Sequence, residues 1–118
     1  MAASPEAEKQ AYDQAFQSLK ELRYADAADA FRSFLDRYPD SEYADNAQYW
    51  LAESYYVTQK FKQALPAFEK VVAEYPRSGK VPDALLKIGY CNYELQRWEA
   101  ARNALNRVRS EFPDTTAA

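Results

Sequence analysis

Histidine is missing from the sequence, and cysteine and glycine are scarce. Among 118 residues there are one cysteine, Cys91, and two glycines, Gly79 and Gly89. Without histidine the chain has no imidazole for acid-base chemistry, and one thiol cannot form the clusters that hold structural zinc. Two isolated glycines do not form the glycine-rich loops that bind phosphate groups. We therefore expect no enzyme, no metal site and no cofactor.

The single cysteine has two interpretations. Cys91 is either a redox or metal-binding thiol, or a small apolar residue on the inner face of a helix. Unpaired cysteine is among the residue types most often buried, which favours the packing role. Because one cysteine cannot form an internal disulfide, cysteine usage does not indicate the cellular compartment.

Positive charge and long apolar runs are also limited. The chain has 15 Lys and Arg residues against 18 Asp and Glu residues, a formal net charge of −3. This balance does not suit the phosphate backbone of a nucleic acid. No stretch approaches the roughly 20 consecutive apolar residues that span a bilayer, so we expect neither nucleic-acid binding nor membrane insertion. The length fits one folded domain, residues 1–118.

An internal repeat with a period of 37 residues runs through the chain. An aromatic residue followed by proline recurs at this step, at Tyr38-Pro39, Tyr75-Pro76 and Phe112-Pro113. Apolar positions follow the same step, including Ala27, Ala64, Ala101 and Phe31, Phe68, Leu105. Such self-similarity is typical of solenoid proteins. It predicts three units, at about 8–44, 45–81 and 82–118.

Each unit contains two amphipathic helical patterns and no alternating strand pattern. The spacing of apolar residues predicts helices over 5–22, 24–38, 42–59, 61–75, 79–96 and 98–111. The proline that ends each unit stops its second helix, because proline cannot continue the hydrogen-bond ladder. For the same reason Pro66 must lie in the opening turn of its helix or kink it. The fold class is therefore all-α.

These positions resemble the tetratricopeptide repeat, whose pattern is W-x2-L-G-x2-Y, then A-x3-F, then P. In the second unit the matching residues are Leu51, Ala52, Tyr55, Ala64, Phe68 and Pro76. The resemblance implies a right-handed superhelix of three helix-turn-helix units, six helices in all. Small residues at the L-G position would let the paired helices approach closely.

Both ends of the array carry polar residues where other units carry apolar ones. Arg102 and Arg109 lie on one face of the last predicted helix, and Gln10 and Gln14 lie on one face of the first. These substitutions indicate a complete three-unit module without a buried continuation helix at either end. The alternative is chance variation in a degenerate repeat.

The first helix of each unit lines the concave side of such a superhelix, and aromatic residues dominate the positions predicted to point there. Tyrosine combines a stiff apolar ring with a polar tip, which suits a surface that is exposed to water and binds a peptide. We predict that the groove binds a partner helix or extended segment through Tyr12, Phe16, Leu19, Tyr49, Trp50, Glu53, Tyr56, Leu86, Tyr90 and Tyr93. The alternative is that several of these tyrosines pack between units.

The two tryptophans are interpreted differently. Trp50 stands at a repeat position that is otherwise charged, which favours an anchor for a partner. Trp98 belongs with Tyr24 and Phe61 at the turn between helices, and we interpret it as structural.

The charged residues of the concave side offer two hypotheses. Glu53, Asp83 and Glu94 indicate a ligand with some basic residues around an apolar stripe. A wall-active hydrolase that uses an acidic pair such as Glu53 and Asp83 is the enzymatic alternative, but paired carboxylates need a pocket and a fixed separation.

Two segments narrow the family further. Residues 46–56 read NAQYWLAESYY and residues 82–95 read PDALLKIGYCNYEL. Together with the Tyr-Pro-x-Ser turns, they resemble the C-terminal repeat domain of the bacterial Tol-Pal-associated cell division coordinator. The resemblance implies a periplasmic adaptor that binds a TolA-like inner-membrane protein and links outer-membrane constriction to cell-wall synthesis through a bifunctional penicillin-binding protein. It also implies a signal peptide and a trimerising coiled coil ahead of the repeats.

Two alternatives to this function remain. The related repeat lipoprotein of the outer-membrane protein assembly machinery has similar turns, although it has more repeats and a lipidated N-terminal cysteine. A self-associating structural scaffold, in which exposed aromatic residues meet other copies of the chain, is the other alternative.

Overall fold

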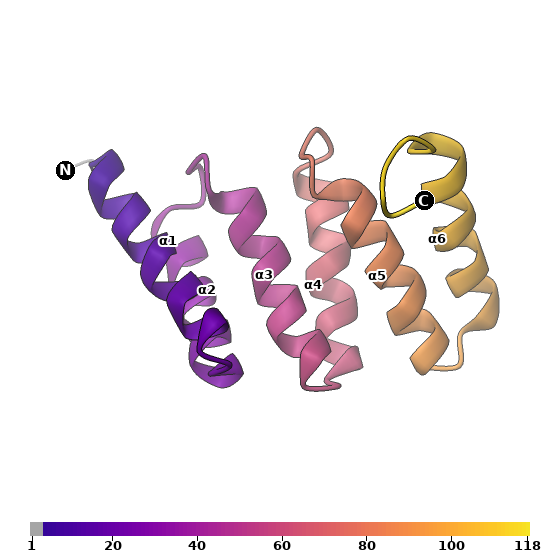
Figure 1. Cartoon of the computed structure of the whole chain (residues 1–118), viewed down its shortest axis with the longest axis horizontal. Coiled ribbons are helices and arrows are strands. Elements are labelled where there is room, and N and C mark those ends of the chain that lie inside the picture. The colour runs from indigo at the N-terminus through magenta and orange to yellow at the C-terminus, as the bar shows by residue number, and fades with distance from the viewer. Residues whose placement is uncertain (1–3) are drawn as a thin grey trace.

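Six helices account for most of the chain in the computed structural model, which describes residues 4–118 (Figure 1). They are α1 Pro5–Lys20, α2 Tyr24–Arg37, α3 Ala44–Val57, α4 Phe61–Glu74, α5 Val81–Glu94 and α6 Trp98–Glu111. No strand occurs among the described residues, and the all-α prediction is confirmed. The predicted helices differ from the observed ones by two residues or fewer at each end, mainly because the first helix of each unit is shorter than expected.

The first helix of each unit ends in the same backbone turn although the residues differ. The residue two positions after Lys20, Val57 and Glu94 has a φ of 62° in every case: Leu22, Gln59 and Gln96. The next N–H closes the turn, as where Arg23 donates to the Ser18 carbonyl at 2.9 Å. This closure satisfies a carbonyl that the helix end leaves free. A residue other than glycine costs roughly 1–2 kcal/mol in the left-handed conformation. Because different residues adopt it at the same position of every unit, the packing of the repeat sets this turn and not the residue type.

The helices form two layers, and each helix packs against the next one along the chain (Figure 1). The first layer contains α1, α3 and α5, and α1 also contacts α3 directly. The second layer contains α2, α4 and α6. The array is 46 Å long and 27 × 21 Å across, so the described chain is an elongated stack of three helix hairpins.

The buried apolar side chains divide into two clusters. The first lies between α1, α2 and α3, around Phe31 and Phe34. The second lies between α3, α4, α5 and α6, around Phe68 and Val71. Trp50 packs against both clusters, so its indole joins the first unit to the second.

A small residue allows close helix approach in the third unit. A Cβ atom added to Gly89 would lie 2.6 Å from Cδ2 and 2.8 Å from Cγ of Leu105. The equivalent positions in the other units hold alanine, Ala15 and Ala52, and both alanines are fully buried. In those two units, phenylalanine stands at the repeat position that Leu105 occupies in the third unit. The branched leucine therefore leaves room only for glycine.

We expect Gly89→Ala to lower the free energy of unfolding by about 1 kcal/mol or more, because the collision with Leu105 outweighs the better helix propensity of alanine. Urea denaturation checks this value. The double variant Gly89→Ala, Leu105→Phe restores the pairing of the other units and should recover most of the loss. A double variant that is less stable than Gly89→Ala alone would contradict the explanation.

Pro66 lies inside α4 and not in its opening turn. It is the sixth residue of a helix that begins at Phe61, so the carbonyl of Lys62 has no N–H partner one turn ahead. Both Pro66 and Lys62 are exposed, which lets water reach that carbonyl. Of the two positions expected for Pro66, the opening turn is therefore excluded, and the proline lies within the helix. The chain tolerates the proline because it faces solvent.

Replacement of Pro66 by alanine should stabilise the domain by about 1–3 kcal/mol, because alanine restores the missing backbone hydrogen bond. Thermal unfolding measures the gain. Pro76→Ala is the matched control, since residue 76 follows the end of α4. Neither proline nor alanine at this position donates a backbone hydrogen bond within the helix. Equal effects of the two substitutions would count against this account.

The polar residues predicted at the two ends of the array are exposed. Gln10 and Gln14 are exposed on α1, and Arg102 and Arg109 are exposed on α6. After α6 the chain turns back and places Ala117 in the second cluster. None of the helices within residues 4–118 has the length and apolar character needed to cross a membrane.

Candidate functional site

The predicted partner-binding residues all lie on the first-layer helices, and we call their shared surface the first-helix face. It contains Tyr12, Phe16 and Leu19 of α1, Tyr49, Trp50, Glu53 and Tyr56 of α3, and Leu86, Tyr90 and Tyr93 of α5. Most of these side chains are partly buried. Tyr90 and Tyr93 are 41% and 60% exposed, whereas Tyr49 is 6% exposed. The exposed aromatic surface is therefore concentrated on α5.

The aromatic residues of α1 pack on one another. The ring centroid of Tyr12 lies 5.1 Å from that of Tyr43 and 6.1 Å from that of Phe16, both in stacked arrangements. Burial raises the pKa of the Tyr12 hydroxyl above its usual value. These contacts hold Tyr12 in place and leave only part of its ring for a partner.

Trp50 is held by neighbours on several sides. Its indole meets Phe16 of α1 edge to face at 5.4 Å and Tyr49 at 5.1 Å. The ammonium group of Lys80 lies 4.7 Å from the centre of the same ring. Trp50 thus packs between units whether or not it also anchors a partner.

The structure places Tyr49 in the core and not on the surface of the first-helix face. Its ring packs edge to face on buried Phe68 of α4 at 5.5 Å. Burial raises the pKa of its hydroxyl, and the negative charges of Glu53 and Asp83 add to this effect. The register argument missed this because position 49 borders the core stripe of α3. Tyr49 offers almost no surface to a partner.

Glu53, Tyr56 and Lys87 form a compact group between α3 and α5. The ammonium nitrogen of Lys87 lies 3.2 Å from Oε1 of Glu53 and donates a hydrogen bond to Oε2 at 3.3 Å. The same ammonium lies 4.3 Å from the centre of the Tyr56 ring. The side chains of Glu53 and Lys87 are only 18% and 20% exposed. This ion pair joins the second unit to the third.

Tyr93 of α5 and Trp98 of α6 remain open to solvent. Their rings meet edge to face at 5.1 Å, and Trp98 is 54% exposed. In the preceding unit the equivalent pair, Tyr56 and Phe61, is partly buried, because Lys87 of the next unit covers Tyr56. Within residues 4–118 no later helix covers Tyr93. Trp98, interpreted as structural from the sequence, is therefore also an exposed aromatic surface.

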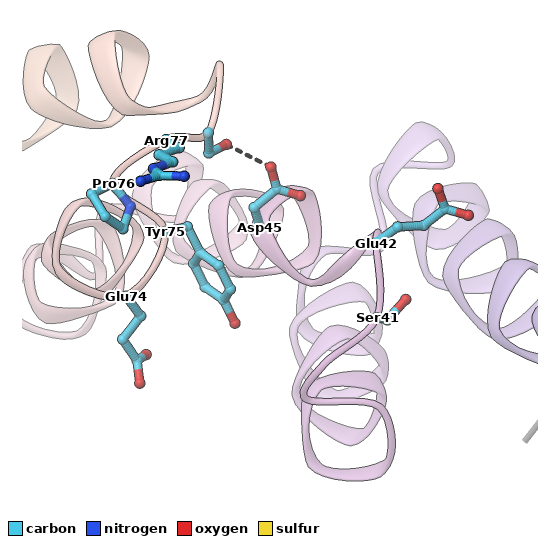
Figure 2. A pocket seen from close by; sticks show the side chains of 8 residues that line it. Ser41, Glu42, Asp45, Glu74, Tyr75, Pro76 and Arg77 are labelled. Atoms are coloured by element: carbon cyan, nitrogen blue, oxygen red, sulfur yellow. Dashed lines mark hydrogen bonds between the residues drawn. The ribbon is translucent and has the colours of Figure 1, made fainter. Parts of the chain in front are cut away.

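Several cavities lie away from the first-helix face. One of about 420 Å³ lies at the turns before α3 and α5 and is shown in Figure 2. It is lined by Ser41, Glu42, Asp45, Glu74, Tyr75, Pro76, Arg77 and Ser78. The hydroxyl of Ser78 donates to Asp45 Oδ2 at 2.6 Å, which ties the second turn to α3. The recurring Tyr-Pro-x-Ser motif was the sequence signal for this site, but it was interpreted only as a turn.

The thiol of Cys91 is fully buried in the second cluster. Burial raises the pKa of Cys91 to about 12, although the positive charge of Lys87 opposes the shift. The thiolate, which is the reactive form, is therefore rare at neutral pH. The packing interpretation of Cys91 is confirmed.

Comparisons with known protein families agree with this geometry. Residues 5–85 match the family described as Outer membrane lipoprotein, YfiO, and residues 83–115 match a tetratricopeptide repeat family. The chain belongs to the YfiO family. Its six helices form tetratricopeptide repeats, as the resemblance to the repeat pattern implied.

A curated relative supports the more specific resemblance drawn from the sequence. The cell division coordinator CpoB of Pseudomonas putida is 51% identical over 49 residues, which cover 42% of this chain and 18% of the coordinator. The chain is thus similar to the tetratricopeptide-repeat domain of that coordinator and matches a small part of its length. Tetratricopeptide repeats form the extended binding surfaces of solenoid proteins, so the repeat-family match supports a protein-interaction module.

A solved structure has the same architecture. A chain of the CopN-Scc3 complex superposes with a TM-score of 0.82 at 18% sequence identity. The superposition covers 96% of this chain and 63% of that chain. At this level of identity the likeness concerns the fold alone.

Replacement of Trp50 by alanine should lower the free energy of unfolding by about 3–5 kcal/mol, because it removes a large side chain that, like Tyr55, contacts both apolar clusters. Tyr93→Ala should change it by less than about 1 kcal/mol, since the Tyr93 ring is mostly exposed. Urea denaturation of both variants makes the comparison. If the two losses were equal, Trp50 would not be the link between the units.

Proposed function

We propose that the first-helix face binds a peptide or helix of a Tol-system protein in the periplasm during cell division. The observation that carries the proposal is the exposed aromatic surface of α5, with Tyr90 at 41% and Tyr93 at 60% exposure. Soluble proteins rarely leave large aromatic side chains together at the surface unless the surface binds something. The likeness to a cell division coordinator supports the cellular role.

The chemistry of the face suits a polypeptide partner. Tyrosine and tryptophan are enriched where binding energy concentrates, because they bury a large area at a small cost in side-chain entropy. Trp50 and Phe16 extend the aromatic surface from α5 to α1, and both are partly exposed. A partner lying across the three first helices would contact all of them. Phe16 and Trp50 are already held by neighbours, which lowers the ordering cost of binding at these two residues.

The proposed partner is a TolA-like inner-membrane protein. In this role the repeat domain, residues 1–118, would connect constriction of the outer membrane with cell-wall synthesis, which a bifunctional penicillin-binding protein carries out. A coiled coil outside this chain would join three copies of the full-length protein. Each copy would then present one first-helix face, and three weak contacts would add up to a stronger attachment.

The double variant Tyr90→Ser, Tyr93→Ser should weaken binding of the purified periplasmic part of TolA about 30-fold, because both side chains belong to the exposed aromatic surface. Isothermal titration with the wild-type and variant chains measures the affinity. Thermal unfolding of each variant shows whether the fold persists.

Tyr75→Ser is the matched control, since Tyr75 is a partly buried tyrosine that lines the cavity at the turns and not the first-helix face. It should leave the affinity within about twofold of wild type. Loss of binding in Tyr75→Ser with full binding in the double variant would move the site to the turns. A wild-type chain that forms dimers in concentrated solution and ignores TolA would favour the self-associating scaffold.

A further inference from the structure

Glu53 lies at the centre of the first-helix face with one oxygen unsatisfied. Its Oε1 atom is inaccessible to solvent and accepts no hydrogen bond. The Lys87 ammonium is 3.2 Å from Oε1, but its hydrogen-bond geometry is directed to Oε2, at 3.3 Å. Charge-assisted hydrogen bonds between ammonium and carboxylate are normally about 2.7–2.9 Å long. The pair is therefore loose for a carboxylate that is only 18% exposed.

Such an arrangement is costly for the free domain. A buried polar atom without a partner loses its hydration and gains no replacement, and native structures retain few of them. A carboxylate can accept about four hydrogen bonds through its two oxygens, and here Glu53 accepts one. Oε1 thus has unused hydrogen-bonding capacity, because the donor beside it, the Lys87 ammonium, is directed to Oε2.

Two further acidic residues lie close to the tyrosines that neighbour Glu53. Asp83 and Glu94 on α5 lie near enough to Tyr49 and Tyr56 that, after burial, they help to raise the pKa of those hydroxyls. Lys87 is the one base paired with Glu53 among the described residues. Lys80 is directed elsewhere, over the rings of Tyr49 and Trp50 at 5.0 and 4.7 Å.

We infer that the polypeptide bound by the first-helix face carries a lysine or arginine side chain that donates a hydrogen bond to Glu53 Oε1, with apolar residues on either side of it. The inference rests on the proposed function of that face. Because Oε1 is closed in the free domain, the partner's donor must displace the Lys87 ammonium from it, and the flexible stem and 20% exposure of Lys87 allow this movement. The flanking apolar residues lie on Tyr90 and Trp50.

Selection from a displayed library of random peptides, each about 12 residues long, tests the inference, because such a library samples basic, acidic and apolar ligands alike. The wild-type chain and Glu53→Gln are used as parallel baits. Glu53→Gln keeps the shape of the side chain and removes its charge. We expect the wild-type chain to enrich peptides with a basic residue between apolar residues, and Glu53→Gln to lose the basic preference while it keeps the apolar one.

One enriched peptide then gives a quantitative comparison. Replacement of its basic residue by norleucine should weaken binding to the wild-type chain about 10-fold or more, and binding to Glu53→Gln by less than about twofold. Glu69→Gln removes an exposed acid from the far side of α4 and should behave as wild type. Lys87→Met frees the whole carboxylate and should tighten binding of the basic peptide, whereas a purely structural ion pair would give no gain.

The outcomes separate this inference from the proposed function. Peptides that lack a basic preference on the wild-type chain, or that keep it on Glu53→Gln, overturn the role of Glu53. Peptides that bind the Tyr90→Ser, Tyr93→Ser double variant with the affinity of the wild-type chain occupy another surface. This result overturns the first-helix face as the binding site. Urea denaturation of Glu53→Gln and Lys87→Met shows that the compared chains are folded.

Discussion

Contact between consecutive first helices is the constraint on which the array depends. Each unit leaves an aromatic or apolar side chain on its first helix, and a residue of the next first helix covers it. Trp50 covers Phe16, and Lys87 covers Tyr56 through a cation–π contact at 4.3 Å. The two covering residues share one repeat position although their chemistry is unrelated. Trp50 meets the ring of Phe16 edge to face and Lys87 places its ammonium over the ring of Tyr56, and both contacts are favourable with the electron-rich face of an aromatic side chain.

The same constraint explains the distribution of exposed surface. In a solenoid each unit contacts its neighbours only, so the apolar face of any unit is covered by the next one. The first two units of the chain have a following unit, whereas Tyr93 and Trp98 have none among the described residues. On the first-helix face, aromatic side chains are therefore covered where a further unit follows and exposed where none follows among the described residues.

Much of the fold could be predicted from the sequence, because the repeat supplies three independent copies of each signal. The aromatic-proline turns and the alanine positions at 27, 64 and 101 located the helices within two residues. The site was harder to predict. Whether Tyr49 lies in the core or on the surface depends on a rotation of α3 by a fraction of a turn, which one sequence does not determine. The loose pairing of Glu53 with Lys87 depends on distances between helices, and no local pattern encodes them.

The separation of the apolar side chains into two clusters has a mechanical consequence. The hairpin of α1 and α2 shares its own cluster and meets the rest of the molecule mainly along α3. Force applied at the N-terminal end would act on that seam first, and the hairpin would peel away while α3 to α6 stay folded around the second cluster. A stack divided in this way lengthens in steps under force, whereas a molecule with a single undivided core unfolds at once.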